Sequence, residues 1–144
     1  MHNWRSTVKR STKVYKGNAL RDGKAHSGWF VGRFISQRPR RTERVEVKMS
    51  VHHNPYRESE SSANRTATSM ALITSGSCEY RFRIGKRGQW RRVLLRRPGD
   101  YVIWEPGVYH SLRVSKRCEM VVVRWPSAGR SDKTRAKSPW LARR

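Results

Sequence analysis

Short segments rich in β-branched and aromatic residues follow one another from residue 29 to residue 125, separated by turn residues. Between them, apolar residues do not repeat at the 3.6-residue period of an amphipathic helix. Strands spaced about 8–12 residues apart are typical of an all-β sandwich or barrel, whereas an α/β fold needs helices between its strands. We therefore expect about eight strands, at Trp29–Ile35, Val45–His53, Thr66–Thr74, Tyr80–Ile84, Trp90–Arg96, Tyr101–Trp104, His110–Ser115 and Met120–Trp125.

The segment 45–53 alternates strictly between two faces. One face is charged or polar, and the other carries Val45, Val47, Met49, Val51 and His53. Alternation with a period of two residues predicts a strand that is half-buried against a core. We therefore expect the face with Met49 and His53 to line the barrel interior.

Positive charge is concentrated toward the two ends of the chain. The sequence has 33 Lys and Arg against 10 Asp and Glu, a net charge of +23, and residues 42–85 contribute almost none of it. The ends also lack a sustained apolar period. We expect a flexible basic arm over residues 1–27, a single barrel domain over 28–126, and a flexible basic tail over 127–144.

A turn–strand–turn motif runs from Gly99 to His110. Gly99 begins a tight turn into a strand, and Pro106-Gly107 forms the next turn, where Pro fixes φ and Gly accepts a positive φ. The strand after it opens with His110, which has the same parity as Leu112. This motif resembles the second conserved motif of the cupin superfamily, whose fold is a jelly-roll β-barrel.

The wider sequence is similar to small stand-alone bacterial cupins of the RmlC-like group, some of which carry the label "signal peptidase". Four further segments carry this resemblance, namely Gly28–Gly32, Val45–Lys48, Asn64–Thr68 and Val123–Ser127. The resemblance implies one all-β jelly-roll barrel of about eight strands. An interior of that size holds side chains or one small ligand.

The first metal-binding motif of cupins is degenerate in this sequence. The family pattern of His-x-His, then Glu, then Gly would place its ligands at residues 63–66 and at Ser69, counting back from Gly76, and no histidine stands there. A metal bound through imidazole and carboxylate needs three or more such ligands. We expect no cofactor; a divalent metal would have to use His53, His110 and Glu58 or Glu60.

The sequence favours a small-molecule pocket inside the barrel, without a well-formed metal site. The expected lining residues are His53, His110, Met49, Leu112, Trp104 and Tyr101. Two readings stay open beside it. The two histidines could simply be bonded inside a filled barrel, or the chain could be a metal-dependent enzyme, since many cupins are isomerases or oxygenases.

A second class of function follows from the charge. A strongly basic surface attracts nucleic acid and acidic proteins. The arginines Arg91, Arg92, Arg96 and Arg97 are interleaved with tryptophans, an arrangement that suits stacking of single-stranded nucleic acid. The alternative reading is therefore a basic module that binds nucleic acid or an acidic partner.

Cysteine content and hydropathy lead to expectations about the cell compartment. Cys78 and Cys118 form no Cys-x-x-Cys pair and no disulfide framework, which predicts a reducing, cytoplasmic environment. The apolar runs are too short for a membrane-spanning helix, so no membrane partner is expected. A homodimer through the edge segment 29–35 is a further expectation.

Overall fold

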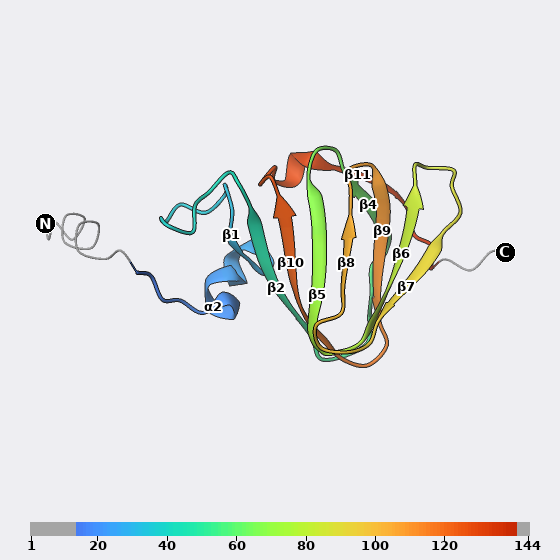
Figure 1. Cartoon of the computed structure of the whole chain (residues 1–144), viewed down its shortest axis with the longest axis horizontal. Helices are drawn as coiled ribbons and strands as arrows, with labels where there is room; N and C mark the ends of the chain where they lie inside the picture. The colour runs from blue at the N-terminus through green and yellow to red at the C-terminus, as the bar shows by residue number, and fades with distance from the viewer. Residues whose placement is uncertain (1–13, 141–144) are drawn as a thin grey trace, which may run out of the picture.

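Two antiparallel β-sheets face each other in the computed structural model, which describes residues 14–140 (Figure 1). Sheet A has the strand order β1 (Trp29–Val31), β2 (Glu46–His52), β10 (Cys118–Trp125), β5 (Thr68–Gly76) and β8 (Tyr101–Trp104). Sheet B has the order β11 (Lys133–Lys137), β4 (Glu60–Asn64), β9 (Val108–Val114), β6 (Cys78–Ile84) and β7 (Arg91–Leu95), and β3 (Tyr56–Arg57) also pairs with β9. The expected all-β architecture is confirmed.

Within residues 14–140, three short helical segments accompany the sheets. The helix α2 (Ala19–Gly23) and the 3-10 turn η1 (Lys24–His26) precede β1, and α2 contacts β1 and β2 at the edge of sheet A (Figure 1). Another 3-10 turn, η2 (Arg130–Asp132), leads into β11. Among residues 14–140, no helix is long and apolar enough to cross a membrane.

The core fills the space between the two sheets. Its buried members come from both sheets and comprise Ala71, Ile73, Cys78, Tyr80, Leu95, Trp104, Leu112, Val114, Cys118, Met120 and Val122. Residues that pair across neighbouring strands share a face of the sheet. The register of each pair therefore identifies which side chains point into the barrel.

The orientation of β2 differs from the prediction. In the pairing with β10, Lys48 is in register with Val122, which is buried in the core, whereas Met49 is in register with Val121 on the other face. His53 follows the end of the strand and is exposed. The expectation that Met49 and His53 line the interior is therefore wrong. Both faces of β2 are at least half-buried, so apolar alternation alone could not distinguish the interior face.

The folded domain extends beyond the expected boundary at residue 126. Strand β11 pairs with β4 along its whole length, from Lys133 opposite Asn64 to Lys137 opposite Glu60. On the N-terminal side, α2 and η1 lie within the stretch expected to be an arm. Residues 1–13 and 141–144 of the expected arm and tail lie outside the described residues.

The carboxylate of Asp132 anchors this C-terminal segment. It accepts hydrogen bonds from the Thr66 backbone N–H at 2.9 Å, the Thr66 hydroxyl at 2.7 Å and the Ala67 N–H at 3.1 Å. The Arg65 N–H donates to the Asp132 carbonyl at 2.8 Å. Although burial acts to raise the pKa of Asp132, these bonds hold it below its ordinary value. Asp132 therefore joins η2 to the turn between β4 and β5.

Candidate functional site

A row of buried polar side chains crosses the interior face of sheet A near one end of the barrel. Ser69 on β5 is in register with Trp104 on β8 on one side and with Arg124 on β10 on the other. Arg124 is in turn in register with Glu46 on β2. All four residues are buried. Because paired residues share a face, these side chains form one continuous polar row inside the barrel.

His110 of sheet B faces this row from across the barrel. The turn before β9 contains Gly107 with a φ of +85°, a conformation that L side chains rarely adopt. Three residues later the His110 ring lies 4.7 Å from the Trp104 ring, between centroids. His110 and Leu112 are both buried. The structure thus brings together three of the predicted lining residues.

Five buried polar atoms in this part of the barrel have no hydrogen-bond partner among the described residues. They are Ser69 Oγ, Trp104 Nε1, Arg124 Nε, His110 Nδ1 and Asn64 Oδ1. Asn64 lies on β4, two residues after Ser62, and Ser62 is in register with His110. Asn64 therefore lies on the same face of sheet B as His110. Buried polar groups are nearly always hydrogen-bonded, and leaving one unpaired costs roughly 1–3 kcal/mol. The cluster therefore has the composition of a site that is completed by a guest molecule or by water.

Arg124 is held by the aromatic and acidic neighbours around it. Its guanidinium lies 4.5 Å from the centre of the Trp29 ring, and its Nη1 is 3.9 Å from Glu46 Oε2. Glu46 is fixed by the Gly129 N–H at 3.0 Å and the Ser127 hydroxyl at 3.3 Å. The orientation of Arg124 is thus set from one side, while its Nε–H remains free.

Two lysines add positive charge around Arg124. Burial, together with the nearby charges of Arg124 and Lys48, lowers the pKa of Lys133 to about 8. Burial and the charge of Arg124 also lower the pKa of Lys48. Both lysines are half-buried. The mutual repulsion of these three cations marks a region of positive potential that an anion would neutralise.

The pKa values of Glu58 and His110 shift in opposite directions in this region. Burial raises the pKa of Glu58 to about 7, against the opposing effect of the nearby cations Lys133, Lys48 and Arg124. Burial lowers the pKa of His110 to about 3, and the charges of Arg124 and Lys133 act in the same direction. At neutral pH the imidazole is therefore uncharged, and Glu58 is protonated in about half of the molecules.

The residues present do not fit a divalent metal. No group of three or more His, Cys, Asp or Glu side chains within residues 14–140 could hold one. His53 is exposed, away from His110, and Glu60 forms an ion pair with Arg135 at 3.4 Å. A cation beside His110 would also face the positive charges of Arg124 and Lys133. The ligand set considered from the sequence is thus not assembled.

Other residues singled out from the sequence lie outside the barrel. Tyr101 is 62% exposed, so it does not line the interior as predicted. It is on β8 three residues before Trp104, and residues at odd separation point to opposite faces of a strand. The arginines of the predicted nucleic-acid set, Arg91, Arg92, Arg96 and Arg97, are exposed on β7 and the turn after it.

Sequence reasoning missed three of the charged residues at the barrel end, namely Lys48, Arg124 and Lys133, and it considered Glu58 only as a possible metal ligand. One signal for Arg124 was present. It is a charge at a core-facing position of β10, two residues after the buried Val122, where the preceding core-facing residues are apolar. No comparable local signal marks Lys133, because pairing with the distant strand β4 brings it to the site.

Comparison with known proteins identifies the fold. No protein-family model matches the sequence, and no curated protein matches it significantly. Several solved structures are similar. One is an uncharacterized conserved protein with a double-stranded beta-helix domain from Klebsiella pneumoniae, with 20% identity and a TM-score of 0.51 over 67% of this chain and 78% of that one.

Two more of the similar structures carry informative names. A cupin protein from Bacteroides fragilis matches with 11% identity and a TM-score of 0.50 over 62% of this chain and 71% of that one. Oxalate decarboxylase from Bacillus subtilis matches with 16% identity and a TM-score of 0.55 over 64% of this chain but 24% of that one. The chain therefore has the jelly-roll fold of cupins, as predicted. The narrower resemblance to small stand-alone bacterial cupins stays a prediction.

Proposed function

Since the chain has a cupin fold, we propose that it binds a small anionic molecule at the polar end of the barrel. The observation that carries the proposal is the set of five unpartnered buried polar atoms around Ser69, Trp104, Arg124, His110 and Asn64. A single small guest in this region could satisfy several of them at once. A folded barrel that leaves these atoms unpaired gives up several hydrogen bonds.

The hydrogen-bond donors among the five unpartnered atoms indicate the charge of the molecule that would bind there. Trp104 Nε1 and Arg124 Nε can only donate, and the Ser69 hydroxyl can donate or accept. A carboxylate, which only accepts, complements these groups. Lys48 and Lys133 supply further positive charge at half-buried positions. We therefore infer a small mono- or dicarboxylate, with its charged end toward Arg124 and Lys133.

Isothermal titration calorimetry with oxalate, malonate, succinate and inorganic phosphate tests this proposal. We expect at least one carboxylate to bind. Lys133→Met should weaken that binding by about tenfold or more, because a charge-assisted interaction in a partly buried site is lost. Lys137→Met is the matched control, since Lys137 lies on the same strand but is exposed. It should keep the affinity of the unchanged protein.

The pH dependence of binding gives an independent readout. Lys133 carries its charge below a pKa of about 8, so affinity for the carboxylate should fall as the pH rises through and beyond that value. The Lys133→Met variant should lack the part of this fall near pH 8 and should keep the part near pH 7 that arises from ionisation of Glu58. Absence of any binding heat at pH 7, or an equal loss in the Lys133→Met and Lys137→Met proteins, would contradict the proposal.

A further inference from the structure

The outer face of sheet B carries a second cluster of cations, on the side of the sheet that faces away from the barrel interior. Arg81 on β6 is in register with Arg92 on β7, and Arg113 on β9 is in register with Glu79 on β6. Glu79 accepts from Arg92 Nε at 2.8 Å, from Arg81 Nε at 3.1 Å and from Arg113 Nη2 at 3.3 Å. Three arginines therefore share one carboxylate, which leaves a net positive charge.

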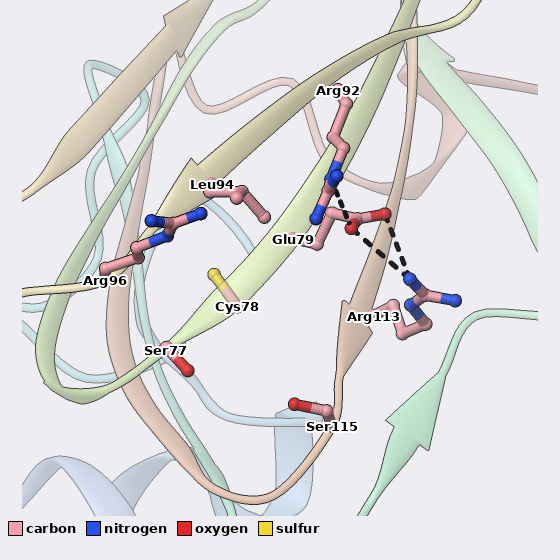
Figure 2. A pocket seen from close by; sticks show the side chains of 8 residues that line it. All are labelled: Ser77, Cys78, Glu79, Arg92, Leu94, Arg96, Arg113 and Ser115. Atoms are coloured by element: carbon pink, nitrogen blue, oxygen red, sulfur yellow. Dashed lines mark hydrogen bonds and ion pairs between the residues drawn. The ribbon is translucent and has the colours of Figure 1, made fainter.

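A pocket of about 270 Å³ opens on this face (Figure 2). Figure 2 shows Arg92 and Arg113 converging on Glu79, with Arg96 on the opposite side and the hydroxyls of Ser77 and Ser115 below. The Arg96 guanidinium takes no part in the ion pairs of residues 14–140. The pocket thus offers guanidinium and hydroxyl donors, a combination that suits phosphate oxygens.

Two of these arginines lie over one aromatic ring. The guanidinium carbons of Arg81 and Arg113 are each 4.7 Å from the centre of the Trp140 ring. Trp140 Nε1 donates to the Ser111 hydroxyl at 2.8 Å, and the Trp140 backbone N–H donates to the Ser138 hydroxyl at 3.1 Å. The ring is half-buried, so it is fixed in position and still partly accessible.

We propose that this outer face of sheet B binds single-stranded nucleic acid. Backbone phosphates would lie against Arg92, Arg96 and Arg113 in the pocket, and a base would stack on Trp140 in place of the Arg81 guanidinium. Phosphate-binding cations beside a fixed aromatic ring are the two elements of sequence-tolerant recognition of single strands. Of the four arginines that the sequence indicated, Arg92 and Arg96 line this pocket, whereas Arg91 and Arg97 do not.

Fluorescence anisotropy with the full chain and a fluorescein-labelled oligothymidylate of about 12 nucleotides tests the phosphate contacts, since binding modules of this kind cover roughly 4–16 nucleotides. The double variant Arg92→Gln, Arg96→Gln should bind about tenfold more weakly at 50 mM salt. Its slope of log affinity against log salt should be shallower by about 1.4, which is two contacts at about 0.7 each. The control Arg33→Gln, Arg41→Gln removes the same charge from exposed positions near β1 and should keep the slope.

The stacking contact is tested separately. Trp140→Ala should weaken oligothymidylate binding by about tenfold, since it removes one base–aromatic stack. Tyr101→Ala removes an exposed aromatic from the other sheet and should leave affinity unchanged. If the Gln double variant does not melt like the unchanged protein, Arg92→Lys, Arg96→Lys takes its place. It keeps the charge but loses the planar guanidinium, and we expect weaker binding with an unchanged salt slope.

Four results would overturn this inference. The first is no binding at 50 mM salt. The second is an equal loss in the pocket variant and the Arg33, Arg41 control. The third is no loss in Trp140→Ala. The fourth is displacement of the oligonucleotide by poly-L-glutamate of equal total charge as readily as by unlabelled oligothymidylate, which would indicate an acidic protein partner. None of these bears on carboxylate binding inside the barrel, because the two sites lie on opposite faces of sheet B.

Discussion

Lowering the pH from 7 to 4.5 should change the stabilities of the His110→Phe and Glu58→Gln variants in opposite directions. The Glu58→Gln protein should lose about 3 kcal/mol of unfolding free energy, and the His110→Phe protein should gain about as much. The unchanged protein should vary far less over this range, because the two effects offset each other. Phenylalanine is a suitable replacement because the His110 ring packs against Trp104, Tyr80 and Phe82.

The signs follow from the direction of each pKa shift. The pKa of His110 is about 3 in the folded protein and 6.5 ordinarily, so the unfolded chain binds more protons between these values. Its contribution to stability is present above pH 6.5 and is lost as the pH falls toward 3. The pKa of Glu58 is about 7 when folded and 4.5 ordinarily. Its contribution is present below pH 4.5 and is lost as the pH rises through 7.

Urea unfolding at pH 7 and pH 4.5, followed by tryptophan fluorescence, measures these free energies. His53→Gln and Glu105→Gln serve as controls, since they make comparable substitutions at exposed positions. Parallel changes in the His110→Phe and Glu58→Gln proteins would show that these groups do not titrate in the buried, cation-rich environment described here.

Replacing Asp132 should cost about 3 kcal/mol of stability, the second large effect that we expect. Asp132→Ala leaves the backbone N–H groups of Thr66 and Ala67 without their acceptor in a part-buried position. The loss also frees η2 and β11 from the turn between β4 and β5. This substitution therefore tests whether the segment after residue 126 is part of the domain.

Asp100→Ala is the matched control for this substitution. Asp100 also accepts two backbone hydrogen bonds, from Arg96 and Arg97, but these lie at an exposed turn. Water can replace its carboxylate there, so the cost should be below about 1 kcal/mol. Thermal melts followed by circular dichroism compare the two proteins. An Asp132→Ala protein that melts like the Asp100→Ala protein would mean that the C-terminal segment contributes little to the fold.

Local pattern was sufficient to predict most strands and the position of one interior histidine. All eight predicted segments overlap strands of the structure, because β-branched and aromatic residues at turn-bounded intervals favour extended backbone. The turn at Pro106-Gly107 and the parity of His110 with Leu112 also follow from local sequence. These features depend only on residues that are close together in the chain.

Features that depend on pairing between distant strands were not predictable. The segments of β4 and β11, with sequences Glu-Ser-Ser-Ala-Asn and Lys-Thr-Arg-Ala-Lys, are too polar to resemble strands, and they are extended because they pair with each other. Likewise, Lys48 reaches the barrel interior because of its register with Val122. The charged part of the site is therefore a property of the sheet register, which the sequence does not display.

A crystal structure of the protein in malonate, at a resolution that shows ordered water, tests whether the barrel binds a carboxylate. We expect a malonate carboxylate in the barrel that accepts hydrogen bonds from Trp104 Nε1 and Arg124 Nε, with His110 beside it. Ordered water alone around these atoms, with no malonate in the barrel, would contradict it.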